Sequence, residues 1–327
     1  MDKSNKLSDL KPILTLYVLS PLIAELLFGS TPVSRSVQLI FESLLYGSGV
    51  LLVREFARRQ RLGWTSIILL GIAFGVVEEC ILLQSAFNPQ FLGNDLSFGR
   101  SGGVNWVWGQ YIIGYHAIWS IAIPILVAEL IYPDRKTQPW LNKTGIAITS
   151  SIYLFSCVAF YSTFVKLSGF TTSFIHYLVA GVLAFVLIVL AVYLPSRISV
   201  KSASKKPAPF VIGIIAFAGS TIWLILFSLL FKQGVGLPAW IVQLSGILIV
   251  LILFFFLSGW VRQNWNENHW FSVAFGCLMA SMIFGLTTLI QSGNQLDIAS
   301  QVAFILITTG LMFLLYKRLI KRNRTII

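Results

Sequence analysis

Charged side chains are scarce in this sequence. Asp, Glu, Lys and Arg make up 11% of the 327 residues, whereas 56% of the residues are hydrophobic. A soluble domain carries about a quarter charged residues, so this composition leaves too little polar surface to cover a chain folded in water. The bilayer is therefore the expected solvent, and the composition excludes an ordinary soluble enzyme or binding domain.

Cysteine and acidic residues are also few. The three cysteines, Cys80, Cys157 and Cys277, fall inside apolar segments, and no pair has the CxxC spacing of a zinc-finger or thioredoxin-like site. The 12 acidic residues face 24 basic ones, which gives a net charge of +12. No basic stretch is interleaved with aromatic residues as in nucleic-acid-binding proteins. The excess is instead typical of the cytoplasmic loops of a membrane protein.

Long apolar runs dominate what remains. A spanning helix needs about 20 mostly apolar residues. Stretches that contain Pro separate the runs at 133–139, 195–209 and 232–238. The sequence thus predicts an all-α polytopic membrane protein with about ten transmembrane helices, at residues 12–28, 36–53, 64–86, 111–132, 145–165, 174–195, 209–231, 238–259, 270–291 and 297–316.

The distribution of Lys and Arg gives these helices a direction. If the N-terminus is inside and the loops alternate, 20 of the 24 basic residues lie inside, and only Arg35, Arg100, Lys166 and Lys232 lie outside. Such an excess marks the cytoplasmic side. We therefore expect both termini inside and a multi-pass protein of a cell membrane, with the cytoplasmic membrane of a prokaryote as its expected location.

Three parts are expected along the chain. Residues 1–195 form a bundle of six helices that contains the buried charges, with a long outer loop at 84–109. Residues 196–208 form a basic cytoplasmic linker. Residues 209–327 form an apolar scaffold of helices 7 to 10 with a basic tail, and this scaffold is the expected surface for any oligomer. The outer loop is rich in Gly, Asn and aromatic residues, and Trp106 and Trp108 fit either an interfacial aromatic belt or a lid.

Seven ionisable residues interrupt the predicted spans, where each is costly unless it has a partner. In the predicted topology Glu129 sits at the inner edge, where a salt bridge near Asp134 and Arg135 explains it. The other six fall in the outer half of the membrane although they come from five helices: Glu25, Glu42, Glu78, Glu79, His116 and His176. This shared depth predicts one polar cavity that opens to the outside.

The third predicted helix has features that suit such a site. Gly71 and Gly75 form a small-xxx-small face that permits close approach of another helix. Glu78 and Glu79 are adjacent, so on a regular helix they point about 100° apart and only one is expected in the cavity. Glu and His bind divalent metals, and a buried Glu also acts as a general base on water while His stabilises an oxyanion.

The layout resembles the CAAX-protease and bacteriocin-processing (CPBP) intramembrane peptidases. A Glu-Glu pair is followed by a His on the next helix and by a second His two helices later, over roughly residues 64–195. Leu83, Ile112 and Ala180 stand where the family motifs have Arg, Phe, and Asn or Asp. The resemblance implies that Glu78 or Glu79 activates water and that His116 and His176 complete the site. Because three motif positions differ from the family, the protein is either an active peptidase or an inactive relative of these peptidases in this hypothesis.

Three functions stay open from the sequence. The first is an intramembrane hydrolase or peptidase, or its inactive relative, with the catalytic set Glu78, Glu79, His116 and His176 supported by Glu25 and Glu42. Its cofactor would be a divalent metal on Glu78, His116 and His176, and its substrate a peptide or lipid-linked molecule from the outer side. The second is a proton- or cation-coupled transporter or channel. The third is a non-catalytic scaffold or sensor that uses loop 84–109 for recognition.

Overall fold

The computed structural model describes residues 3–194, 207–228, 236–261 and 265–325, so the predicted linker at 196–208 lies almost wholly outside the described residues. Each of the ten predicted segments is mainly helical where it is described, although helix ends before residues 27–28 and 83–86. The helices are α1 (Lys3–Pro21), α2 (Ser36–Arg59), α3 (Trp64–Val76), α4 (Trp106–Tyr115), α5 (Ile123–Ile131), α6 (Lys143–Ser168), α7 (Phe174–Tyr193), α8 (Pro209–Ser228), α9 (Ala239–Val261), α10 (Glu267–Ser292) and α11 (Gln295–Thr325).

Five shorter helical turns complete the helical structure. Three are π-helical and continue neighbouring α-helices: η1 (Leu22–Leu26), η3 (Val77–Leu82) and η4 (His116–Ala122). Two are 3-10 turns: η2 (Val33–Arg35) and η5 (Pro133–Arg135). Because η4 joins α4 to α5, these three elements form one long membrane helix.

Within the described residues, 8 helices are long and apolar enough to cross a membrane. They correspond to α2, α3, α4 with α5, α6, α7, α8, α10 and α11, and α9 contains a shorter apolar stretch at Ala239–Phe254. The chain is therefore a multi-pass helical membrane protein. The total of ten spans stays a prediction, because α1 is not among these 8 helices and the apolar stretch of α9 is shorter.

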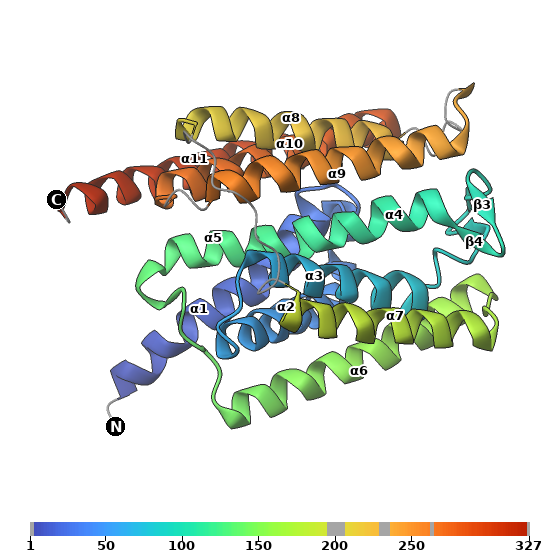
Figure 1. Cartoon of the computed structure of the whole chain (residues 1–327), viewed down its shortest axis with the longest axis horizontal. Coiled ribbons are helices and arrows are strands. Elements are labelled where there is room, and N and C mark those ends of the chain that lie inside the picture. Colours follow the sequence, from blue (N-terminus) through green and yellow to red (C-terminus); the bar gives the residue numbers. More distant parts are fainter. Residues whose placement is uncertain (1–2, 195–206, 229–235, 262–264, 326–327) are drawn as a thin grey trace.

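The helices lie side by side along the long axis of the molecule (Figure 1). Helices α8 to α11 lie together along one side of α1 to α5, and α6 and α7 lie along the opposite side (Figure 1). Most side chains of α6 and α7 are exposed, which is expected for helices that face lipid. This arrangement leaves α3 and the α4–α5 helix in the centre, where 67% and 78% of their most apolar stretches are buried.

The close approach predicted for α3 is confirmed. A Cβ atom added to Gly71 would lie 2.9 Å from the Cα atom of Ala117, and one added to Gly75 would lie 3.1 Å from the Cα atom of Ile113 and 3.2 Å from the Cβ atom of His116. Small residues let helix backbones meet at such distances. The two glycines therefore bring the end of α3 directly against the turn that carries His116.

The predicted loop 84–109 is shorter than expected and ordered. Helix α4 already begins at Trp106, with Asn105 as its N-cap, so the connection ends there. Two short antiparallel hairpins form within it, β1 (Gln90–Phe91) with β2 (Asn94–Asp95) and β3 (Arg100–Ser101) with β4 (Val104–Asn105). Helix α4 starts at Trp106 rather than at residue 111, so His116 lies about 15 Å along the helix from its first residue. His116 is therefore farther from this connection than the sequence predicted.

Arg100 holds this connection together. Its Nη1 atom donates hydrogen bonds to the carbonyl oxygens of Phe87 (2.9 Å) and Gly103 (2.8 Å). Burial lowers the pKa of the Arg100 guanidinium, because the charged form loses water. We call the end of the molecule that carries residues 84–105 the loop end.

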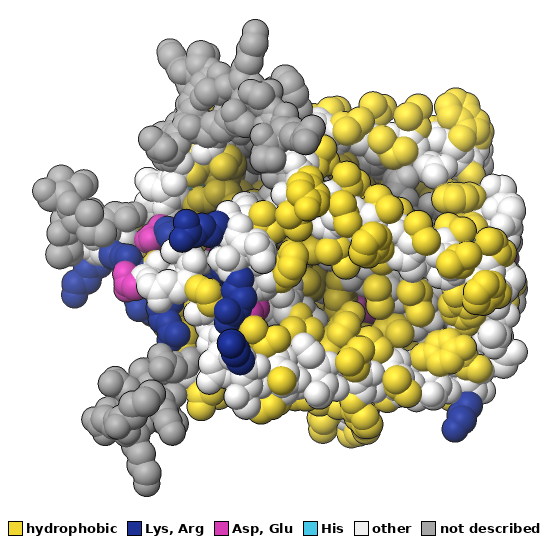
Figure 2. Space-filling view, turned by 60° about the horizontal axis from the view of Figure 1, so that its bottom comes forward, with side chains coloured by type: hydrophobic (Ala, Val, Ile, Leu, Met, Phe, Trp, Pro, Cys, Tyr) yellow, Lys and Arg dark blue, Asp and Glu magenta, His cyan; other side chains and the backbone are white. Residues whose placement is uncertain are grey.

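The opposite end, which we call the basic end, carries the last turns of α2 with Arg54 and Arg58, the α5–α6 connection with Lys136, and both ends of the chain, which are marked N and C in Figure 1. Figure 2 shows Lys and Arg side chains gathered there, beyond a wide hydrophobic belt. This distribution follows the predicted alternation of basic loops. The structure contains no membrane, so the inward orientation of this end stays a prediction.

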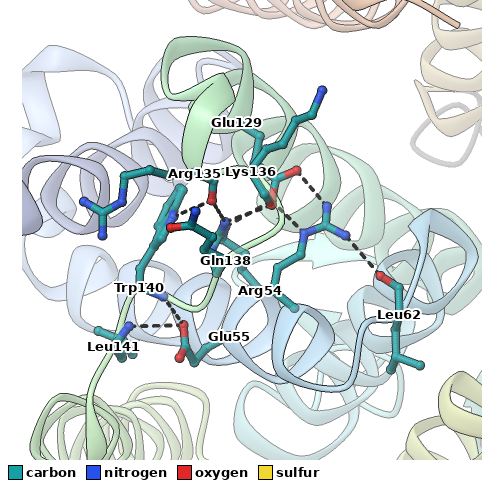
Figure 3. A network of polar contacts seen from close by, with 10 residues as sticks. Arg54, Glu55, Leu62, Glu129, Arg135, Lys136, Gln138, Trp140 and Leu141 are labelled. Atoms are coloured by element: carbon teal, nitrogen blue, oxygen red, sulfur yellow. Dashed lines mark hydrogen bonds and ion pairs between the residues drawn. The ribbon is translucent and has the colours of Figure 1, made fainter.

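The salt bridge expected for Glu129 is confirmed, and the structure identifies the arginines that form it. Glu129 binds Arg54 (3.1 Å) and Arg58 (2.7 Å), both on α2, whereas Asp134 pairs with Arg322 (2.7 Å). A helical register explains the choice, because Arg54 and Arg58 are four residues apart and share one face of α2. Figure 3 shows this network, in which Arg54 also donates to the carbonyls of Arg135, Lys136 and Gln138.

Candidate functional site

The candidate site lies where three π-helical turns meet. Glu25 is in η1, Glu78 and Glu79 are in η3, and His116 is the first residue of η4. Turns of this kind are rare and occur frequently at functional sites inside α-helices. Four of the six residues predicted from the sequence therefore stand on locally widened helix.

Glu78, Glu79 and His116 form the centre of the site. The Oε1 atom of Glu79 lies 2.8 Å from the Nε2 atom of His116, and the Oε2 atom of Glu78 lies 3.3 Å from its Nδ1 atom. All three residues are buried, with 2%, 3% and 3% of their surface exposed. One imidazole thus lies between two carboxylates in a region without access to bulk water.

The expectation that only one of the two glutamates reaches the site was wrong. Glu78 and Glu79 both address His116, from opposite ring nitrogens. In η3 the chain follows the wider π-helical course, with the amide of Leu83 bonded to the carbonyl of Glu78 at 2.8 Å. This local widening is the distortion that a regular helix lacks, and it lets two adjacent side chains converge.

Each member of the centre has a further hydrogen-bond partner. Tyr46 on α2 donates to the Oε1 atom of Glu78 at 2.6 Å, and the Ser120 hydroxyl lies 3.0 Å from the Nδ1 atom of His116. The Ser85 hydroxyl donates to Glu79 and accepts from the indole nitrogen of Trp108 at 2.8 Å. These contacts fix the three side chains, while the Oε2 atom of Glu78 accepts no hydrogen bond from the described residues.

Glu25 and Glu42 form a second carboxylate pair that is less buried than the centre. The Thr31 hydroxyl lies 2.8 Å from Glu42 and 3.2 Å from Glu25 and joins them. Both glutamates are half-buried. Glu42 precedes Tyr46 by one turn of α2, so α2 carries both this pair and the tyrosine that binds Glu78.

His176 is not brought into the centre. Its Nδ1 atom bonds with Thr172 (2.8 Å) and Ser173 (3.0 Å), and its ring stacks on Phe87 at 4.6 Å. The amide of Thr172 in turn donates to the side chain of Gln84 at 2.8 Å. His176 therefore joins α7 to the loop end of the molecule, and among the described residues it makes no contact with the two glutamates.

The set of possible metal ligands differs accordingly from the predicted one. Among the described residues, the ligand atoms of Glu78, Glu79 and His116 lie within 4.8 Å of one another, and His176 does not belong to this group. Catalytic zinc sites use three protein ligands of these types. The histidine of such a site has its other nitrogen held by a polar group, as Ser120 holds His116.

An apolar pocket of about 200 Å³ lies beside the site, between α2, α3, α6 and α7. Phe74 forms its inner wall, and its ring lies against Tyr46 (6.0 Å) and edge-on to His116 (6.2 Å). Ile188, at the other side of the pocket, is 40% exposed on the outer surface of α7. A single aromatic ring thus separates the polar centre from a hydrophobic space at the lipid-facing side.

Several residues of the site escaped sequence reasoning. Tyr46 and Ser85 are buried partners of the centre, but Tyr and Ser are common in membrane proteins and carry no distinguishing spacing, whereas Ser120 lies one turn from His116 as a hydrogen-bonding partner would. The sequence did contain one signal for Tyr46, because it lies one turn from Glu42 on the same face of the helix.

Arg54 was predicted to lie in a loop because it follows the end of an apolar run, whereas it is buried in α2.

Together, the apolar helices and the buried Glu/His cluster define a multi-pass membrane protein with a polar site in its interior. Residues 14–322 match the family model of an uncharacterized membrane protein family, and the chain belongs to this family. No curated protein and no solved structure matches the chain. The matching family model is not that of the CPBP peptidases, so that resemblance stays a prediction.

Proposed function

We propose that the protein is an intramembrane hydrolase in which Glu78 is the general base and His116 the general acid. The observation that carries this proposal is that the two glutamates differ in their hydrogen bonds. Glu79 has hydrogen bonds to both Ser85 and His116, whereas the Oε2 atom of Glu78 faces the Nδ1 atom of His116 at 3.3 Å and accepts no hydrogen bond from the described residues. A carboxylate oxygen that lacks a hydrogen bond can accept one from a water molecule, which is the contact that a general base needs.

The roles follow from the contacts. Glu78 takes a proton from water, and the water oxygen forms a bond to the carbonyl carbon of an ester or amide. As the tetrahedral intermediate collapses, the bond from that carbon to the leaving oxygen or nitrogen breaks, and protonated His116 gives its proton to the leaving atom. Glu78 then passes its new proton to His116 across the 3.3 Å contact, which restores the starting state.

Glu79 and Tyr46 act as positioning residues in this proposal. Glu79 fixes the ring of His116 and compensates its positive charge, as the carboxylate of a catalytic triad does for its histidine. Tyr46 fixes the other oxygen of Glu78 at 2.6 Å. The protein thus orients both proton-transfer groups before a substrate arrives.

The surroundings favour a hydrophobic substrate that enters from the membrane. The apolar pocket beside Phe74 is suited to a hydrophobic chain or side chain, and it opens beside Ile188 on the lipid-facing side. Transport through the bundle is less favoured, because buried apolar residues separate the site from the basic end. These are Val50 and Leu51 between Tyr46 and Arg54, and Ile121 and Ile125 between His116 and Glu129.

The resemblance to the CPBP peptidases supports this proposal in part. The Glu pair and His116 come together as that resemblance implies. Because His176 binds Thr172 instead of the glutamates, we propose a site with one histidine, His116, whose Nδ1 atom is held by Ser120.

Purified protein tests the proposal with two kinds of probe in detergent micelles: p-nitrophenyl esters of increasing chain length and a quenched fluorescent peptide with an apolar segment. Loss of a general acid or base typically lowers a rate by about 10²–10⁴-fold, so we expect losses of this size in Glu78→Gln and His116→Ala. Asp95→Asn, which removes an exposed loop carboxylate, is the matched control. Hydrolysis at the wild-type rate by both site variants would exclude this mechanism.

A metal-dependent form of the same reaction is the second candidate, because the three ligand atoms lie within 4.8 Å of one another. A bound divalent ion would supply a more acidic water and polarise the carbonyl. Elemental analysis of the purified protein and of the Glu79→Gln variant tests it. About one metal ion per chain in the wild type, and its loss in the variant, would favour this form; a metal-free active protein would exclude it.

A further inference from the structure

A second pocket, with polar walls, lies at the basic end, far from the Glu/His site along the helices. It has a volume of about 170 Å³ and lies where α10 meets the α2–α3 turn and α5. Arg58, Trp64, Lys136, Glu267 and Trp270 form its polar and aromatic walls, and Leu126 and Leu130 form its apolar floor. We call it the basic-end pocket.

Most of the charge in its walls is already used by the fold. Glu129 accepts hydrogen bonds from both Arg54 and Arg58, and Arg58 also donates to the carbonyl of Leu62 at 3.0 Å. Figure 3 shows Glu129 in these contacts with Lys136 close to it. The groups that stay available for a ligand are therefore Lys136 and Glu267.

The contact between Lys136 and Glu267 is loose. The Nζ atom of Lys136 lies 3.8 Å from the Oε1 atom of Glu267, which is longer than a hydrogen bond. The Lys136 side chain is 50% exposed, whereas that of Glu267 is 16% exposed and its Oε2 atom is buried without a hydrogen-bond partner among the described residues. One cationic and one anionic group thus face each other with unused bonding capacity on both sides.

Aromatic rings line the pocket beside Glu267. Trp64 and Trp270 stack with their ring centroids 5.3 Å apart, and Trp265 packs edge-on against Trp270 at 5.1 Å. Indole faces attract cations, and a carboxylate beside them is the common arrangement for binding an organic ammonium group. The anionic side of the pocket therefore suits an ammonium ion, while Lys136 suits an anion.

We propose that the basic-end pocket binds the zwitterionic headgroup of an aminophospholipid. Its ammonium group contacts Glu267 and Trp270, and its phosphate contacts Lys136 and the hydroxyl of Thr137. The headgroup inserts between the two loosely paired side chains and gives each a closer partner. A lipid is the favoured source because the pocket lies at the basic end of the membrane helices and is lined by Trp64 and Trp270, and tryptophan is enriched at membrane interfaces.

Native mass spectrometry of the full-length protein tests this proposal. The protein is taken from nanodiscs that contain equal amounts of phosphatidylethanolamine, which has a primary ammonium, and phosphatidylglycerol, which has none. We expect wild-type protein to retain the first lipid about tenfold more than the second, because an ammonium bound by a carboxylate and an indole differs by about that factor from a neutral headgroup. In Glu267→Gln the retention ratio should fall close to one.

Two further variants make the outcome specific. Lys136→Gln should weaken retention of both lipids, since both carry the phosphate. Asp134→Asn is the control, because it removes a carboxylate at the same end that is 84% exposed and outside the pocket, and it should keep the wild-type ratio. Equal retention of the two lipids by the wild type, or an unchanged ratio in Glu267→Gln, overturns the proposal.

Soluble glycerophosphoethanolamine separates the possible sources of the headgroup. If the free compound at millimolar concentration displaces no retained lipid, the acyl chains contribute to binding and the lipid source is supported. If it displaces the lipid fully and binds as tightly, the pocket recognises a soluble zwitterion, and the lipid assignment is overturned.

Discussion

Glu79 lies 2.8 Å from the Nε2 atom of His116, between two central helices of a bundle from which bulk water is excluded. Removal of one partner from a buried ion pair typically costs about 3–5 kcal/mol, because the other charge is left uncompensated. His116→Ala leaves two adjacent carboxylates without a cation. We expect it to lower the free energy of unfolding in detergent by an amount in that range.

The pairing is tested by a double-mutant cycle with Glu79→Gln, His116→Gln and the double variant. Residues in direct contact show coupling of about 0.5–3 kcal/mol, whereas independent residues add. Additive losses would mean that the contact between Glu79 and His116 contributes nothing of its own to stability.

Gly75 sets the distance between α3 and the turn that carries His116. In Gly75→Ala the added methyl group would meet Ile113 at 3.1 Å and His116 at 3.2 Å, so α4 has to move. Overpacking of this kind typically costs about 1–3 kcal/mol. Thermal unfolding should show a lower midpoint. Gly181→Ala on α7 adds the same methyl group where nothing lies within 4 Å, and an equal loss there would contradict this explanation.

Arg54 should be the most important basic residue for stability at its end of the molecule. It is 1% exposed, stacks on Trp140 with 3.2 Å between the guanidinium carbon and the ring centroid, and binds Glu129 and three carbonyl groups. Arg54→Ala removes one of the two arginines that bind Glu129 and the donor to three backbone carbonyls, and a loss of about 3–5 kcal/mol is expected from unfolding measurements. Lys143→Ala removes an exposed basic residue nearby and should have little effect. Similar losses in both variants would contradict this role.

The predicted orientation can be tested by cysteine labelling in intact cells. A membrane-impermeant thiol reagent should label Asp95→Cys and Lys166→Cys directly, because these exposed positions belong to the predicted outer side. Lys143→Cys and Asp134→Cys should react only after the membrane is opened. The native Cys80 and Cys277 are buried and should contribute little background. Labelling of Lys143→Cys in intact cells would reverse the orientation.

Composition and charge were sufficient for the class of protein and for the approximate position of the described helices, because apolar runs and basic loops are direct consequences of the bilayer. They also led to Glu78, Glu79 and His116, since ionisable residues in apolar segments are rare. They did not reveal how the two glutamates converge, because a π-helical turn depends on hydrogen bonds that periodicity does not report. They also misplaced His176, whose depth matched that of the site while its contacts run to the loop end.

Each π-helical turn contains more residues per turn than the α-helix that it interrupts, so the site depends on the local length of the chain as well as on side-chain identity. Deletion of one residue, such as Val77, would allow η3 to close into regular α-helix. Glu78 and Glu79 would then diverge by about 100° and could no longer hold the same imidazole. Within the family, the number of residues in this segment is therefore as strong a criterion for an intact site as the presence of the two glutamates.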